Sequence, residues 1–110
     1  MTLKEKLSRD KTCLGAFLGF PSPEMVEVLG LTGWDVVVID LEHGSMTRSD
    51  LAHLFRAADS VGIPAMVRVP ENNPKTILGA LDLGAKGILV PMVNSVEEAK
   101  QAVASIHYPP

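Results

Sequence analysis

The sequence has little cysteine, few aromatic residues and no long apolar run. Its single cysteine, Cys13, cannot form a disulfide within the chain, and this usage fits a reducing compartment. The apolar neighbours of Cys13 predict an inert thiol buried in a strand. No apolar run approaches the ~20 residues that a membrane-spanning helix requires. The amino-terminal segment has mixed charge and no apolar stretch, so we expect no signal peptide and a cytoplasmic protein.

Basic residues are not in excess either. Ten lysines and arginines stand against thirteen aspartates and glutamates, for a formal net charge of -3 at pH 7. A nucleic-acid or anionic membrane partner requires a basic surface, so we expect neither. What remains is a chain of 110 residues, the size of one domain. Its 46% hydrophobic content and mean hydropathy of +0.20 suit a well-filled α/β core.

Strand and helix signals alternate along the chain at the spacing of βα units. After a short helix over residues 3–8, strands are predicted over 13–20, 35–40, 63–69 and 87–90. A helix follows each strand, because a capping signal stands there each time: Ser22 with Pro23, Thr47 with Asp50, Asn73 with Pro74, and Ser95 with Glu98. Strands joined through helices run parallel. Four such units suit the first half of a (β/α)8 TIM barrel, which takes about 250 residues, or a small doubly wound domain.

Three of these helices carry an apolar face that we expect to be buried. The faces are Met25, Val28 and Leu29 in the first helix, Leu51, Leu54, Phe55 and Ala58 in the second, and Val96, Ala99, Val103 and Ile106 in the last. The second of them is predicted over residues 48–60, with Gly62 as its stop signal.

The most informative segment is the end of the second predicted strand. Residues 36–39 are four β-branched residues in succession, typical of a strand buried on both faces, and Asp40, Glu42 and His43 follow at once. Ligands bind at the carboxyl ends of strands in parallel α/β sheets. Two carboxylates and an imidazole there predict a functional site. Each residue alone has an ordinary alternative: Asp40 capping a turn, Glu42 solvated, and His43 capping a loop carbonyl.

An arginine ends the next strand. Arg68 follows an apolar run, and its planar guanidinium can hold a carboxylate through two parallel hydrogen bonds. Because neighbouring strands lie about 4.8 Å apart, Arg68 and His43 are expected to line one pocket. The alternative is a structural ion pair of Arg68 with Asp40 or Glu42. Asp82 lies near a helix end, where its charge opposes the helix dipole and needs a partner, and Arg68 is one candidate.

Other polar side chains are weaker candidates. His53 on the polar side of a helix and His107 in the tail are expected at the surface. Lys75, solvated in a first helical turn, and Lys86, ahead of its strand, are poor Schiff-base nucleophiles. The sequence contains no phosphate-binding loop, dinucleotide fingerprint or helical pair of metal ligands.

Several segments occur in the order and with the spacing of one known family. They are residues 40–44 (DLEHG), 67–70 (VRVP), 72–74 (NNP), 81–85 (LDLGA), 89–93 (LVPMV), 97–99 (EEA) and 108–110 (YPP). On these segments the chain closely resembles the HpcH/HpaI aldolases, metal-dependent class II pyruvate aldolases such as the 4-hydroxy-2-oxoheptanedioate and 2-dehydro-3-deoxyglucarate aldolases. The resemblance implies a (β/α)8 barrel, commonly in a hexamer. It also implies reversible cleavage of 4-hydroxy-2-oxo acids into pyruvate, or a related 2-oxo acid, and an aldehyde.

The resemblance further implies roles for individual residues. His43 matches the catalytic histidine, assisted by the aspartate at Asp40, and Arg68 matches the essential arginine that contacts the pyruvate carbonyl or enolate oxygen. Glu42 matches an acid near the metal-bound water, and Asp82 an aspartate that supports the site. The divalent cation is Mg²⁺ or Mn²⁺, with Co²⁺ as a third candidate. Its direct ligands in the family lie on later strands, so none is expected in this chain.

The family barrel extends further than Pro110. Residues 1–110 are therefore interpreted as the N-terminal half of such a barrel, a fragment or truncated product that is inactive without a complementing C-terminal half. The expected partners are a small 2-oxo acid and an aldehyde, with further copies of the chain or the missing half. Two interpretations compete with this one: a non-catalytic half-barrel that keeps only an assembly surface, and a doubly wound binding domain. A receiver-like form of the second would need a phospho-accepting aspartate where Arg68 stands.

Overall fold

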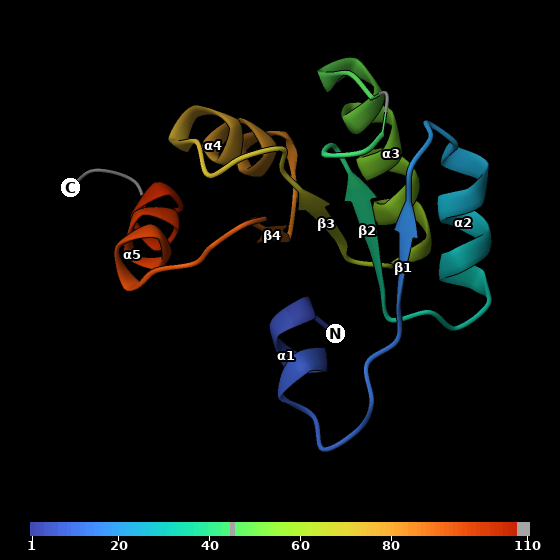
Figure 1. Cartoon of the computed structure of the whole chain (residues 1–110). Helices are drawn as coiled ribbons and strands as arrows, with labels where there is room; N and C mark the ends of the chain where they lie inside the picture. The colour runs from blue at the N-terminus through green and yellow to red at the C-terminus, as the bar shows by residue number, and fades with distance from the viewer. Residues whose placement is uncertain (45, 108–110) are drawn as a thin grey trace.

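The computed structural model describes residues 1–44 and 46–107, which form a sheet of parallel strands with helices around it (Figure 1). In chain order the elements are α1 (Leu3–Ser8), β1 (Gly15–Leu18), α2 (Pro23–Leu31), β2 (Val36–Asp40), α3 (Arg48–Val61), β3 (Ala65–Arg68), α4 (Pro74–Leu83), β4 (Gly87–Leu89) and α5 (Val96–Ser105). The predicted alternation is confirmed, and each strand is shorter than predicted. The motif at residues 108–110 lies outside the described residues.

The strand order separates the two predicted fold classes. The strands lie in the order β1-β2-β3-β4, and each neighbouring pair is parallel. A doubly wound sheet reverses its order at a switch point, whereas a barrel keeps consecutive strands adjacent. The architecture is therefore that of the first half of a (β/α)8 TIM barrel, and the doubly wound alternative is wrong.

The helices begin and end where the capping residues predict. Ser22 caps α2 ahead of Pro23, and Thr47 and Asp50 form a reciprocal capping box at the start of α3. Gly62 ends α3 with a φ of 74°, in the left-handed region that glycine adopts without strain. No helix in the described part of the chain is long and apolar enough to cross a lipid bilayer.

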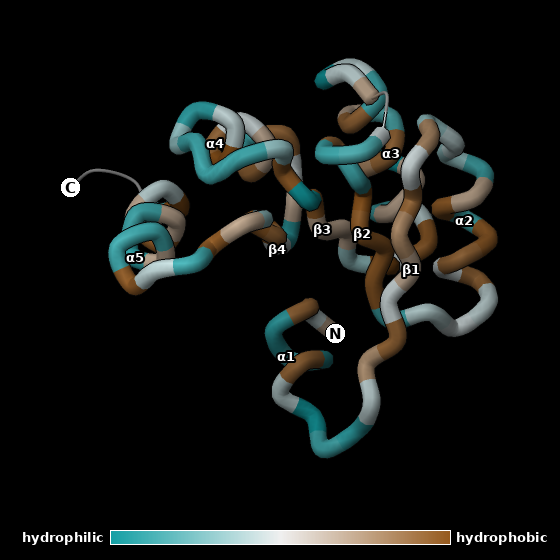
Figure 2. The backbone as a smooth tube through the Cα atoms, in the orientation of Figure 1, coloured by the Kyte–Doolittle hydropathy of each residue, from teal (hydrophilic) through white to brown (hydrophobic). Residues whose placement is uncertain are grey.

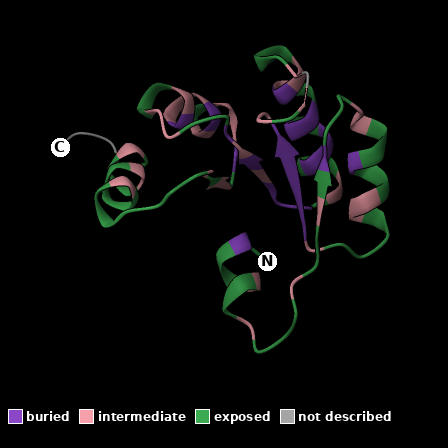
Figure 3. Cartoon of the chain, in the orientation of Figure 1, coloured by how far each residue is buried: buried purple, intermediate pink, exposed green. Residues whose placement is uncertain are grey.

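The hydrophobic core lies between the sheet and its outer helices. β2 is buried along its whole length, as its run of β-branched residues predicted (Figure 3). The predicted face of α3 is buried as well. The most completely buried large side chains come from α2, α3, α4, the two central strands and the residue after β3: Val26, Val37, Ile39, Leu54, Val67, Val69 and Ile77. This core fixes the carboxyl ends of β2 and β3, where the candidate site residues stand.

The predicted face of α2 is confirmed at Leu29, which packs against the core, and is wrong at Met25 and Val28, because the helix is rotated about its axis. Val26 is its fully buried residue, whereas Met25 and Val28 are 39% and 50% exposed. Gly30 lies one turn after Val26, and a Cβ at Gly30 would collide with the side chain of Val61 on α3. Because Gly30 has no side chain, the face of α2 that carries Val26 and Gly30 can approach α3, in place of the more apolar face.

The predicted burial of the last helix is also wrong. Val96 and Val103 are 68% and 55% exposed, and Ala99 and Ile106 are exposed too (Figure 3). α5 carries apolar residues (Figure 2), but it follows β4, the edge strand of the described sheet. A helix at this position packs over the groove between its own strand and the next, and the described residues supply no next strand.

The amino-terminal segment crosses the end of the sheet at which the strands begin (Figure 1). Leu3 on α1 is buried there, and Lys6 Nζ donates to the backbone oxygen of Asp35 at 2.8 Å. Arg9 Nη2 also donates to Asp35 Oδ1, at 3.1 Å. Cys13 lies between α1 and β1 and is half-buried, so its predicted place inside a buried strand is wrong. α1 closes the amino end and leaves the carboxyl end open.

Candidate active site

Asp40 and Arg68 are neighbours at the carboxyl end of the sheet. They are the last residues of β2 and β3, and the strand register pairs them directly. Arg68 Nε donates to Asp40 Oδ1 at 3.1 Å, and Arg68 Nη2 donates to Asp40 Oδ2 at 2.6 Å. Within the described residues Asp40 is the buried charged residue, at 6% exposed. The two-bond geometry predicted for the guanidinium is therefore present, and it binds a carboxylate of the chain itself.

The same carboxylate organises the loop that follows β2. Asp40 Oδ1 accepts the backbone N–H of Glu42 at 2.9 Å and that of His43 at 3.1 Å. The hydrogen bond from Arg68 is the main reason that the pKa of Asp40 falls to about 2, against a smaller opposing effect of burial. The Asp40 carboxylate in turn raises the pKa of Arg68. Both groups are therefore charged at neutral pH.

Glu42 connects the arginine to the histidine. Glu42 Oε1 lies 3.1 Å from His43 Nε2 and 3.5 Å from Arg68 Nε. The side chain of His43 is 68% exposed, whereas that of Glu42 is 21% exposed. The structure thus brings together four of the predicted site residues, with the imidazole outermost. The predicted ion pair of Arg68 with Asp40 or Glu42 is formed with both.

Gly44 allows the loop to turn tightly behind this cluster. A Cβ at Gly44 would collide with the backbone oxygen of Asp40 and would lie 2.9 Å from that of Gly19. The loops after β1 and β2 are therefore in close backbone contact, which restrains the segment that carries Glu42 and His43.

Phe17 also belongs to the site, and the sequence reasoning did not identify it. Arg68 Cζ lies 4.7 Å from the centroid of the Phe17 ring, on β1. The available signal was the alternation of β1: Leu18 is 2% exposed on the helix side, and Phe17 is 57% exposed on the opposite face. An aromatic residue on the inner face of a short strand was therefore a candidate.

Asp82 is not brought to Arg68. It is exposed near the carboxyl end of α4, and the chain then enters β4, where Lys86 N donates to Ala65 O at 2.8 Å. Ala65 is the first residue of β3, so α4 ends at the amino end of the sheet, whereas Arg68 stands at its carboxyl end. The candidate pairing of Asp82 with Arg68 is wrong within this chain because α4 runs antiparallel to the strands.

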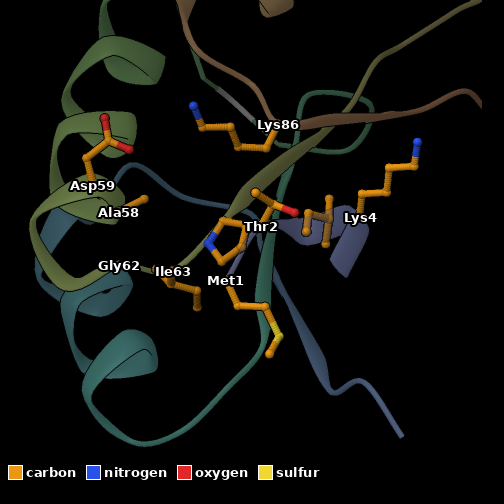
Figure 4. Close-up of a pocket in the computed structure, with 10 residues that line it drawn as sticks. Met1, Thr2, Lys4, Ala58, Asp59, Gly62, Ile63 and Lys86 are labelled. Carbon is orange, nitrogen blue, oxygen red and sulfur yellow. The ribbon is translucent and has the colours of Figure 1, made fainter. Parts of the chain in front are cut away.

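The remaining candidates lie apart from the cluster. His53 contacts Arg56 on the surface of α3 through Nδ1, and His107 and Lys75 are exposed. Lys86 lines a cavity of about 360 Å³ at the amino end of the sheet, together with residues of the α1 segment and of the end of α3 (Figure 4). The catalytic candidates therefore stand at the opposite end from this cavity.

The residues of the cluster do not by themselves fit a divalent cation. Both oxygens of Asp40 bind Arg68, and Glu42 contacts Arg68 and His43. Across residues 1–44 and 46–107, no group of three or more histidine, cysteine, aspartate or glutamate side chains is arranged to hold a metal ion. The expectation that the ligands lie on later strands stays a prediction.

Known proteins match the chain in sequence and in structure. Residues 14–110 match the HpcH/HpaI aldolase/citrate lyase family. A 2-dehydro-3,6-dideoxy-6-sulfogluconate aldolase from Pseudomonas putida is 38% identical over 104 residues, 94% of this chain and 41% of that protein. The crystal structure of an HpcH/HpaI aldolase from Desulfitobacterium hafniense DCB-2 has a TM-score of 0.91 at 33% identity, over 100% of this chain and 43% of that one.

A further solved structure, the citrate synthase SbnG, has a TM-score of 0.91 at 39% identity, over 99% of this chain and 44% of that one. The chain thus spans about two fifths of the length of these relatives. The family match covers nearly all of the chain, and the half-barrel fold and its strand-end cluster agree with it. The chain belongs to the HpcH/HpaI aldolase/citrate lyase family.

Proposed function

We propose that this chain forms half of an aldolase that cleaves a 4-hydroxy-2-oxo acid into pyruvate, or a related 2-oxo acid, and an aldehyde. One observation carries the proposal: two carboxylates hold the guanidinium of Arg68 at the carboxyl end of the sheet, and Nη1 is not among the donors they engage. The Pseudomonas putida relative supports the substrate class, because a 2-dehydro-3-deoxy sugar acid is a 4-hydroxy-2-oxo acid.

Arg68 supplies the positive charge that this reaction requires. When the C3–C4 bond breaks, its electron pair forms the C2–C3 double bond of an enolate, and negative charge develops on the 2-oxo oxygen. The Nη1 hydrogens are directed donors for that oxygen, and they need no reorganisation because Asp40 fixes the other edge of the guanidinium. Removing one such donor typically lowers the rate about 10²- to 10³-fold.

His43 is proposed as the base that removes the proton of the 4-hydroxyl. Glu42 Oε1 lies 3.1 Å from His43 Nε2, and in this proposal the carboxylate keeps the proton of the neutral imidazole on Nε2, which leaves the Nδ1 lone pair to accept the substrate proton, directly or through a water. The deprotonated oxygen becomes the aldehyde carbonyl as the bond breaks. The proton that His43 took up, delivered directly or through a water, then protonates the enolate at C3 and completes the 2-oxo acid product.

Asp40 acts through other residues in this proposal. Its oxygens are engaged by Arg68 and by the backbone N–H groups of Glu42 and His43, so it is a positioning residue for both catalytic groups. The class II divalent cation does not fit the described residues, and we propose that its ligands come from outside residues 1–110. Turnover then requires the other half of a barrel, and in this proposal the completed barrels assemble into a homo-oligomer.

The test is a complementation assay. The chain is mixed with the carboxyl-terminal part of the Pseudomonas putida relative, and pyruvate release from 4-hydroxy-2-oxopentanoate is measured with Mg²⁺ or Mn²⁺, with and without the complement. We expect pyruvate only from the mixture, and at least a 10²-fold loss in Arg68→Lys. Arg56→Lys, at an exposed position on α3, is the matched control. A folded complemented barrel that turns over equally with Arg68→Lys would overturn the role of Arg68, and one without any turnover would favour the non-catalytic assembly.

A further inference from the structure

We infer that Phe17 is a positioning residue for the arginine: its ring is a platform that fixes the guanidinium of Arg68 in the plane set by Asp40. The catalytic consequence rests on the function proposed above, whereas the contact itself does not. Phe17 comes from β1, a strand that carries none of the residues so far given a role in the reaction.

The strand register shows how far Arg68 reaches for this contact. Phe17 pairs with Val38, and Val38 pairs with Met66, so Arg68 stands two residues further along β3 than the position level with Phe17. The side chain of Arg68 therefore crosses β2 and turns back toward β1. It bends over a phenylalanine ring, with Arg68 Cζ 4.7 Å from the ring centroid.

The two contacts restrain different motions of the guanidinium. The oxygens of Asp40 bind one edge, at 3.1 and 2.6 Å, which fixes that edge but leaves the plane free to tilt about it. The ring of Phe17 lies under Arg68 Cζ, 4.7 Å from it, and opposes movement of the guanidinium toward the sheet. A cation over an aromatic face is also attracted to it by the ring quadrupole. The opposite edge of the Arg68 guanidinium, which carries Nη1, therefore keeps a fixed direction.

Phe17 does not behave as a core residue. It is 57% exposed, whereas the next residue of the strand, Leu18, is 2% exposed against the outer helices. Phe20 offers a matched comparison, because it is 53% exposed and has no arginine over its ring among the described residues. A loss of ring packing alone would therefore affect both phenylalanines in a similar way.

The first experiment measures the exchange of the Arg68 Nε–H with water by NMR at neutral pH. The chain has four arginines, and Arg68→Lys assigns the signal by its disappearance. We expect faster exchange of Nε–H in Phe17→Leu, with the parent rate kept in Phe17→Tyr and in Phe20→Leu. Unchanged exchange in a folded Phe17→Leu overturns the inference, as does equal acceleration in Phe20→Leu. If Phe17→Leu does not fold, Phe17→Met makes the same comparison without a ring.

The second experiment uses the complemented barrel. Phe17→Leu should lower kcat/KM about two- to five-fold, the size of an exposed cation–π contact, and Phe17→Tyr should restore it. An unchanged kcat/KM in Phe17→Leu, with faster Nε–H exchange, would show a contact that catalysis does not use. If the parent barrel itself has no turnover, the proposed function fails, and the exchange result still decides the contact.

Discussion

Replacing Asp40 by asparagine should remove a defined part of the acid sensitivity of folding. The pKa of Asp40 is about 2 in the folded chain, against 3.8 for an ordinary aspartate. As the pH falls, the unfolded chain therefore takes up a proton at this position before the folded chain does. The stabilisation is complete above about pH 5 and is lost as the pH falls through the folded pKa.

The magnitude follows from the difference between the two pKa values. Each pKa unit corresponds to about 1.4 kcal/mol, so ionised Asp40 contributes about 2 kcal/mol to the free energy of unfolding at neutral pH. Asp40→Asn should lower that free energy by about the same amount at pH 7. Between pH 4 and 2 the parent should lose about 1 kcal/mol per pH unit more than the variant, and the two should converge below pH 2.

The assay is urea unfolding followed by circular dichroism from pH 2 to 7. Asp35 also has a lowered pKa, chiefly because the backbone N–H of Leu14 donates to it, so the parent and the variant share that contribution and their difference isolates Asp40. Asp10→Asn, at an exposed position in the loop after α1, is the control and should follow the parent at every pH. Equal acid slopes for the parent and Asp40→Asn would refute the reasoning.

Three further substitutions, and Val28→Ala as the control for the last of them, test the site and the core. Glu42→Gln removes the carboxylate charge that lies 3.1 Å from the imidazole of His43, and kcat of the complemented barrel should fall about ten-fold or more with little change in KM; an unchanged kcat would contradict the role of Glu42. Gly44→Ala forces a Cβ against the loop backbone and should lower the free energy of unfolding by about 1–3 kcal/mol in urea titrations; a neutral result would mean that the loop relaxes freely. Leu54→Ala, at a fully buried position of α3, should cost about 2–5 kcal/mol by the same measurement. Val28→Ala on the exposed side of α2 should stay within about 0.5 kcal/mol, and equal losses would disprove the assigned burial.

Much of the candidate site could be predicted because its residues stand at strand ends. A parallel sheet brings the carboxyl ends of adjacent strands together whatever the loops do, so Asp40 and Arg68 were expected to be neighbours. The loop pattern of Glu42 and His43 is similarly local, since both backbone N–H groups bind the side chain of Asp40 within three residues. The position of Phe17 was not local, because its contact with Arg68 spans three strands.

The helix caps, the parallel βα order and the placement of Asp40, Glu42, His43 and Arg68 at adjoining strand ends could all be predicted from the sequence. Each of these depends on the nearest few residues or on the rule that joins consecutive parallel strands. Three features depend instead on how the elements pack in three dimensions: Val26 rather than Met25 faces the core, Asp82 stands at the far end from Arg68, and the apolar residues of α5 are exposed. The burial of a residue depends on the element that packs against it as well as on the residue itself. The sequence pattern around a residue therefore does not identify which element will cover it.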